Sequence, residues 1–152
     1  MRRLVVLAAA LGLAATPALA GDRPAAEVWP RVEHHLRAVA ELAGHFDAVM
    51  QRACPRFATT AEWRTYVNGE VDRVVLLAAH LEQAWIEAKT TADDTVRRAA
   101  KAPRERLDEA RALTGKLATC ARAHGTTLEL ASLWREVERQ VPRRQAEIRL
   151  PP

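Results

Sequence analysis

The stretch "TTAEWRTYVNGEVDRVVLLAAHLEQAWIEA", residues 59–88, decides the fold class. Thr59 and Glu62 stand three positions apart, which is the spacing of a capping box at the start of a helix. The apolar residues that follow recur at alternating steps of four and three, so they line one helical face. They are Val67, Val71, Val74, Ala78, Leu81, Trp85 and Ala88. The stretch therefore predicts a long amphipathic helix, and the apolar residues 75–77 beside the stripe predict that it is the most buried one.

The segment before this helix carries the same periodicity. Residues 30–54 predict a helix with Pro30 in its first turn, where the missing N–H of a proline costs nothing. Pro55 marks its end, because the residue before a proline disfavours the α conformation. We expect a short helical piece at residues 24–29, joined to this helix at a kink.

The segment after residue 88 predicts a third helix over residues 91–124. Thr91 or an adjacent residue caps its start, and Gly125 suits the position just beyond its end. Pro103 interrupts the run and removes one backbone hydrogen bond. We therefore expect a kink or a break near Ala102.

A fourth helix is predicted from a second capping-box spacing. Thr126 and Glu129 stand three positions apart, directly before a periodic apolar run over residues 130–141. Pro142 is expected to bend or end this helix.

Four amphipathic helices with short connections predict an all-α, antiparallel up-down-up-down bundle. Connections of three to six residues force neighbouring helices to run in opposite directions. The composition agrees, because 49% of the residues are hydrophobic and only 6 are glycine. We expect residues 21–152 to form a single helical-bundle domain.

The first twenty residues predict a cleaved signal peptide. Arg2 and Arg3 precede an apolar run, and residues 18–20 read Ala-Leu-Ala, the small-x-small pattern before a cleavage site. The apolar run is too short to span a membrane, so we expect no membrane-spanning segment after cleavage behind Ala20. The composition, rich in alanine and arginine, is typical of a bacterial protein. We therefore expect the protein in the periplasm or secreted.

The two cysteines predict one disulfide. Cys54 ends the first predicted helix and Cys120 lies near the end of the third, and these two helices run in the same direction. Both thiols therefore fall at the same end of the bundle, and an exported chain favours their oxidation. The alternative is a zinc or copper site made by Cys54, Cys120 and His124, because Cys120 and His124 share a helical face.

The remaining histidines offer a second alternative, a haem or metal ion held between helices. His34 and His80 fall at the same level of an antiparallel pair, and His35 is next to His34 in the sequence. His35 lies nearest the apolar stripe of its helix, His34 is expected to point away from that stripe, and His80 lies on the flank of its own stripe. Histidines at a surface or boundary are the simpler interpretation of this pattern, and the primary prediction contains no cofactor.

Other function classes find little support in the sequence. Ser132 lacks a nucleophile motif and no phosphate-binding loop is present, so we expect no catalysis. Nucleic-acid binding is not expected, because acids and bases alternate along the chain and the net charge falls from +4 to about +2 without Arg2 and Arg3. The sequence favours a non-enzymatic accessory or binding protein of the cell envelope. Its partner would be a protein or an anionic surface. The basic residues 97–106 are bracketed by acidic residues, so a solvated face paired with its own acids is their simpler interpretation, and contact with an anionic surface is the alternative.

Overall fold

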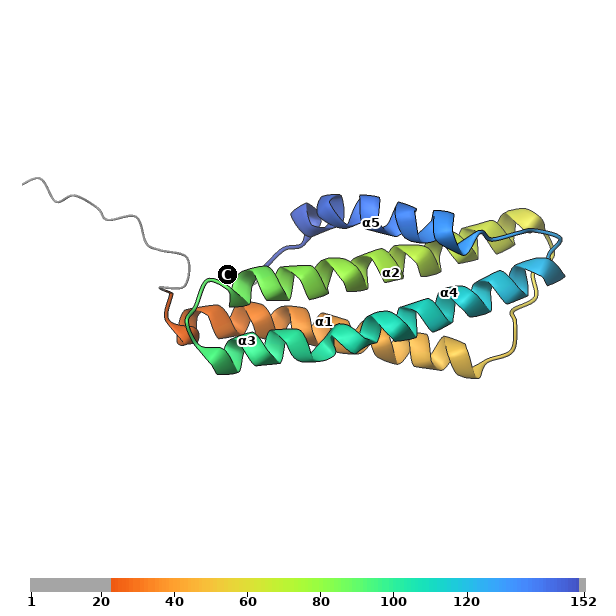
Figure 1. Cartoon of the computed structure of the whole chain (residues 1–152). Coiled ribbons are helices and arrows are strands. Elements are labelled where there is room, and N and C mark those ends of the chain that lie inside the picture. Colours follow the sequence, from red (N-terminus) through yellow and green to blue (C-terminus); the bar gives the residue numbers. More distant parts are fainter. Residues whose placement is uncertain (1–22, 151–152) are drawn as a thin grey trace, which may run out of the picture.

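The computed structural model describes residues 23–150, so the predicted signal segment and cleavage site lie outside the described residues. Within that range the chain forms α1 (Ala25–Gln51), α2 (Thr60–Ala88), α3 (Asp94–Lys101), the 3₁₀ helix η1 (Ala102–Glu105), α4 (Arg106–Ala123) and α5 (Leu130–Glu147). Because α3, η1 and α4 follow one another directly, they serve as one interrupted helix (Figure 1). The predicted all-α, antiparallel four-helix bundle is confirmed.

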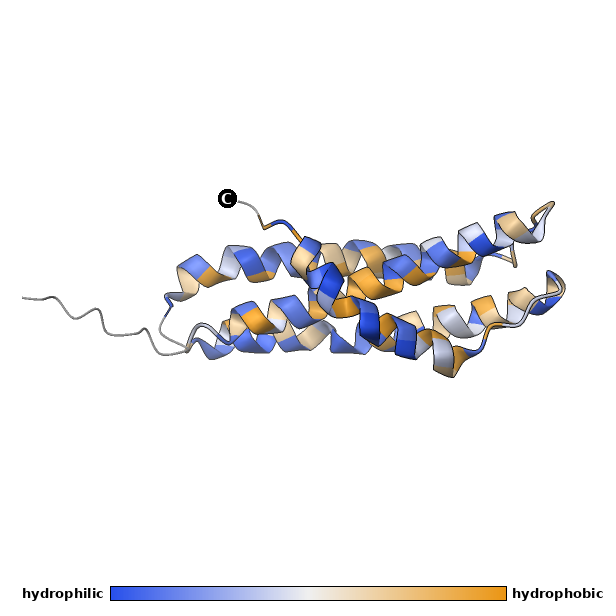
Figure 2. Cartoon of the chain, turned by 90° about the horizontal axis from the view of Figure 1, so that it is seen from above, coloured by the Kyte–Doolittle hydropathy of each residue, from blue (hydrophilic) through white to orange (hydrophobic). Residues whose placement is uncertain are grey.

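The helices pack around two hydrophobic clusters. The α1–α2 interface is the most extensive, α4 packs against α1, and α5 packs mainly on α2 and covers only part of its length (Figure 1). Hydrophobic and hydrophilic positions alternate along each helix (Figure 2), as an amphipathic bundle requires. Phe46, Leu77, Leu113 and Leu117 are fully buried in the larger cluster. No helix among residues 23–150 has the length and apolar character to cross a membrane.

The capping box at the start of α2 is confirmed. The Thr59 hydroxyl accepts a hydrogen bond from the Glu62 N–H at 3.2 Å, and the Glu62 carboxylate accepts one from the Thr59 N–H at 3.1 Å. The second predicted capping box, at Thr126 and Glu129, is wrong. Thr126 turns instead toward the core, where its hydroxyl donates to the Ala121 carbonyl and accepts from the Trp63 indole. This tertiary contact removes Thr126 from the start of α5.

Prolines affect the helices less than the sequence predicts. Residues 25–29 are helical as predicted, but they form the first turns of α1, which runs without a break through Pro30, and are not a separate piece. Val28 and Val32 on either side of Pro30 are both fully buried, and their packing offsets the one missing hydrogen bond. Pro142 likewise lies inside α5 and does not end it.

The interruption predicted near Ala102 is confirmed as η1, with Pro103 in its first turn. Asp93 caps the preceding helix, because its carboxylate accepts hydrogen bonds from the N–H groups of Thr95 and Val96. The third helix of the bundle therefore changes its winding for one turn and then continues toward Ala123.

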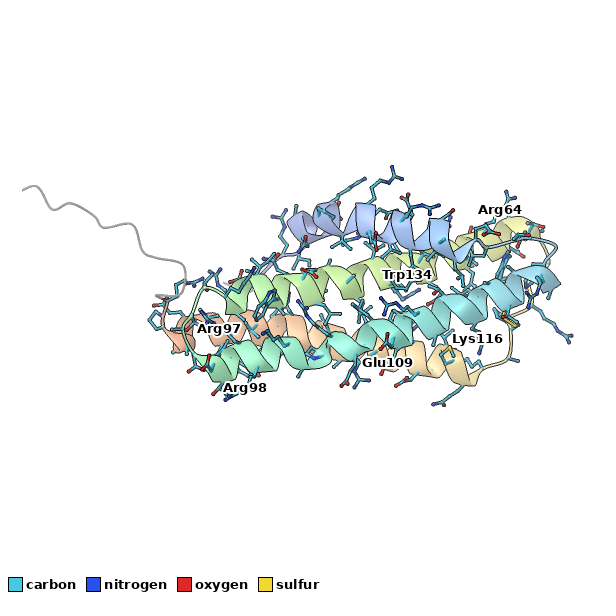
Figure 3. The ribbon with its side chains drawn as sticks, in the orientation of Figure 1. Arg64, Arg97, Arg98, Glu109, Lys116 and Trp134 are labelled. Carbon is cyan, nitrogen blue, oxygen red and sulfur yellow. A yellow bond between two sulfur atoms is a disulfide. The ribbon has the colours of Figure 1, made fainter. Side chains whose placement is uncertain are left out.

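The end of α1 is joined to α4 by two contacts. Helix α1 ends at Gln51, three residues before the predicted end, and Cys54 lies in the loop that follows. The predicted disulfide between Cys54 and buried Cys120 is present, with 5.5 Å between the two Cα atoms (Figure 3). Lys116, one turn before Cys120, donates hydrogen bonds to the carbonyls of Val49 and Met50 at 2.8 Å each, and to that of Arg52. An ammonium group therefore binds carbonyls at and just beyond the C-terminal end of α1, where a positive charge is favourable.

Removing the disulfide is expected to destabilise the bundle without changing its fold. The double variant Cys54→Ala/Cys120→Ala should lose about 4 kcal/mol of unfolding free energy, because the bond closes a 66-residue loop in the unfolded chain. Urea unfolding followed by far-UV circular dichroism measures this loss. The reduced wild-type protein is the matched control and should unfold with the double variant. Equal stability of the oxidised wild type and the variant would contradict the prediction.

Candidate metal centre

Two buried histidines face each other across the α1–α2 interface. His35 occupies a core position in α1, three residues after Val32 and four before Val39, and none of its surface is exposed. His80 lies on α2 and is 6% exposed. The Nδ1 atoms of the two rings lie 2.9 Å apart, which is a hydrogen-bonding distance. The sequence predicts that His80 lies level with His34, and the contact of His80 with the adjacent His35 confirms this register to within one residue. The interpretation of His35 and His80 as surface or boundary residues is wrong.

His34 completes a cluster that the sequence did not predict. Its ring centroid lies 5.4 Å from that of His35 and 6.0 Å from that of His80, and its side chain is half-buried. One ring nitrogen from each of the three histidines lies within 4.8 Å of the others. The expectation that His34 points away is wrong, because it borders the stripe of α1 on the side where His80 borders the stripe of α2.

Burial keeps the two inner histidines neutral. The pKa of His35 is lowered from 6.5 to about 4, first by burial and then by the neighbouring His80 and His34. The pKa of His80 is also lowered to about 4, again by burial first and then by His34. A hydrogen bond between two Nδ1 atoms needs one protonated and one unprotonated nitrogen, so both rings cannot be cationic in this geometry. Neutral imidazoles have the lone pairs that metal ions require.

The inner ring has one polar atom without a partner. Among residues 23–150, no group forms a hydrogen bond with the buried Nε2 of His35. A buried polar atom in this state costs about 1–3 kcal/mol, and an ion bound at Nδ1 of this ring would leave Nε2 with its proton and still unpaired. Packing alone does not explain this cost, because an apolar side chain in the same place would avoid it.

The nitrogen spacing of the His35–His80 pair is compatible with a first-row metal site. Two imidazole nitrogens at about 2.0–2.1 Å from one ion, with an angle near 90° between them, lie about 2.9 Å apart. The observed Nδ1–Nδ1 distance of 2.9 Å is therefore compatible with tetragonal coordination. A haem held between two histidines needs nitrogens about 4 Å apart with the macrocycle between them. These two rings are too close for that arrangement.

The alternative ligand set of Cys54, Cys120 and His124 does not form in this structure. Both sulfur atoms are joined in the disulfide, so neither is a thiolate. The His124 ring stacks on Trp63 with 4.5 Å between the centroids, and its Nε2 lies 2.9 Å from the Pro55 carbonyl oxygen. His124 therefore supports the corner between α1 and α2 and takes no part in the histidine cluster.

The other histidine, His45, forms a separate contact with a buried carboxylate. The Nε2 of His45 lies 2.8 Å from a carboxylate oxygen of Glu70, which is only 2% exposed. Arg73 donates a second hydrogen bond to Glu70 at 3.2 Å. The two donors satisfy this buried carboxylate, so His45 has a structural role in the α1–α2 interface.

Two surface features bear on the predicted partners. The basic residues among positions 97–106 lie along α3, η1 and the first residue of α4, and two of them, Arg97 and Arg98, are labelled in Figure 3. A groove of about 480 Å³ lies between α4 and α5, with Leu107, Trp134 and Val141 among its lining residues. Neither feature identifies an occupant.

Comparison with known proteins does not assign this chain to a family. No protein-family model matches the sequence, and neither the curated proteins nor the solved structures contain a significant match.

The buried histidines predict that acid destabilises the metal-free protein. Because their folded-state pKa values lie below 6.5, the folded state resists protonation, and stability falls as the pH drops from about 6.5 toward 4. For one histidine the loss reaches about 3 kcal/mol at pH 4. Urea unfolding in the presence of a chelator, at several pH values, compares the wild type with His35→Leu/His80→Leu. As the pH falls through this range, the unfolding free energy of the wild type should decrease more than that of the variant.

The His124→Gln variant is the control for this measurement, since it removes a histidine outside the cluster. Its stability should follow that of the wild type as the pH falls. Parallel curves for the wild type and the His35/His80 variant would contradict the assignment of the acid sensitivity to this pair.

Proposed function

We propose that this chain is an exported, non-enzymatic protein that binds one first-row transition-metal ion, Cu(II) by preference, through His34, His35 and His80. The observation that carries the proposal is the convergence of three imidazoles from two helices, with nitrogens within 4.8 Å of one another. This choice favours the metal-ion alternative over the cofactor-free bundle that the sequence alone favours.

The donor set selects the kind of ion. Imidazole nitrogen suits copper, nickel, zinc and iron, whereas magnesium and calcium require oxygen ligands. Cu(II) binds such nitrogen donors more tightly than its neighbours in the series and accepts angles near 90°. Tetrahedral zinc would need the Nδ1 atoms of His35 and His80 to separate to about 3.3 Å.

The burial of His35 in the apolar core favours a specific metal site over a chance grouping of histidines. His35 occupies a core position in the apolar stripe of α1, where a desolvated imidazole costs more than an apolar side chain would. A bundle under selection for stability alone would gain from an apolar residue at this position. Binding an ion would offset part of the cost of burying both rings.

The proposal also includes export from the cytoplasm and a function without catalysis, which the disulfide and the surroundings of Ser132 support. The Cys54–Cys120 disulfide is typical of an oxidising compartment, in agreement with the signal-like residues 1–20. Ser132 lies exposed on α5, where its hydroxyl accepts a hydrogen bond from Arg135 at 2.9 Å. A protein or an anionic surface as partner stays a prediction from the sequence.

Copper binding tests the proposal directly. Purified protein freed of metal should bind one Cu(II) per chain in calorimetry, and its electron paramagnetic resonance spectrum should show coupling to imidazole nitrogen. The His35→Leu/His80→Leu variant should lose at least about 100-fold in affinity, because even the outer partners of metal ligands contribute 10- to 100-fold. Leucine keeps the core apolar and similar in volume, and circular dichroism checks that the variant is folded.

The matched controls are His45→Gln and His124→Gln, which remove histidines outside the cluster. Both should bind copper as the wild type does, and His34→Gln should bind at least about tenfold more weakly. Unchanged affinity and spectrum in the double variant would overturn the proposal and assign the copper to another part of the chain. Tighter binding of Zn(II) than of Cu(II) would overturn the preference for copper.

A further inference from the structure

The histidine cluster lies beneath a pocket formed by the C-terminal end of α5. His34 and His80 line this pocket of about 320 Å³, which is open to solvent, and Ile148 and Arg149 contribute to it from the residues after α5. His35 does not line the pocket and is fully buried. An ion bound by the three imidazoles would therefore have His35 on its inner side and the pocket on its outer side.

Three protein ligands leave an ion with free coordination positions. Sites with three protein ligands commonly hold water or an exogenous ligand in the remaining position. Here the free positions would face the pocket, because His34, His80 and the core around His35 occupy the other directions. The pocket volume lies at the lower end of the range for small-molecule sites.

The charged side chains of the pocket favour an anion. Arg144 and Glu147 both line the pocket and pair with each other at 3.0 Å, and Arg144 also pairs with Asp72 at 2.7 Å. Arg149 is exposed and forms no ion pair with any residue in the range 23–150. Three neutral imidazoles leave a divalent ion with its full charge, and Arg149 adds to that charge.

The uncharged part of the pocket favours an apolar group on the same ligand. Leu76 and Ala38 line it from α2 and α1, and Ile148 lies among the residues after α5. Inorganic anions such as chloride would leave these side chains in contact with water. A carboxylate with a short hydrocarbon group would use both the charge and the apolar wall.

Resting on the metal site proposed above, we propose that this pocket binds a small organic carboxylate as an additional ligand of the metal ion. The carboxylate coordinates the ion on the side left open by the imidazoles and pairs with Arg149, while its hydrocarbon part contacts Leu76 and Ile148. The protein would then bind a metal–carboxylate complex and not the bare ion alone.

Benzoate is the probe for this site, with chloride as the control anion. Titrating benzoate into the Cu(II)-loaded full chain should shift the visible d–d absorption of copper, and calorimetry should show one benzoate per chain. The metal-free protein should bind benzoate at least about tenfold more weakly, since the divalent ion supplies most of the attraction. Equilibrium dialysis verifies that copper stays on the protein during the titration.

Variants separate the two parts of the pocket. Arg149→Gln should weaken benzoate binding about two- to fivefold, as expected for one partly exposed ion pair, and leave copper affinity unchanged. Ile148→Ser should weaken benzoate but not formate, which lacks the hydrocarbon part. Arg139→Gln, which removes an exposed arginine of α5 paired with Glu136, is the matched control and should change neither ligand.

The outcomes distinguish the two proposals. If copper binds through the histidines but benzoate leaves the spectrum unchanged, or strips copper from the protein, the carboxylate site is overturned and the metal site stands. If benzoate binds equally well with and without copper, coordination to the ion is overturned. If the protein does not bind copper at all, both proposals fail together.

Discussion

The hydrogen bond between His35 and His80 is a polar constraint inside the apolar α1–α2 interface, and the two hydrophobic clusters lie on either side of it. It places two desolvated imidazoles in the most extensive helix interface, 2.9 Å apart. The apolar packing divides at this level. The larger cluster extends from Val39 and Leu81 toward the disulfide, and the smaller one from Val32 and Ala84 toward the other end. Two helices that must keep these rings in contact cannot slide past each other, so the pair also sets the register of α1 against α2.

The sequence predicted those features that local chemistry determines. The capping box of Thr59 and Glu62 needs only residues three positions apart, and it forms as predicted. The three-four apolar spacing is equally local, and it gives the helices and their buried faces. The disulfide followed from topology, because short connections force the first and third helices to run in parallel. A helix end misplaced by three residues did not alter that conclusion, since the loop carries Cys54 back to α4.

Features that depend on contacts between distant segments were missed. Thr126 has the spacing of a helix cap relative to Glu129. Its hydroxyl instead accepts a hydrogen bond from the indole N–H of Trp63, which lies 63 residues earlier in the chain. His34 belongs to the cluster only because the edges of two stripes meet across an interface, and helical periodicity alone does not determine which edges meet. The burial of His35 could have been predicted from the sequence, because His35 stands at the core spacing between Val32 and Val39. The pocket over the cluster requires α5 to continue past Pro142, a position where the sequence predicts either a bend or the end of the helix.

The disulfide cross-links the bundle covalently at one end, called here the closed end, and the opposite end, called the open end, has no such cross-link among the described residues. At the closed end, the Cys54–Cys120 bond and the Lys116 ammonium both hold the end of α1 to α4. At the open end, the Glu87 carboxylate has Arg23 at 3.7 Å and Arg31 at 3.8 Å, and mostly small side chains fill the core. Opening motions that begin there reach the histidines before they reach the larger cluster. An ion held by His35 and His80 would cross-link α1 to α2 at the limit of the covalently restrained region, as a reversible counterpart of the disulfide.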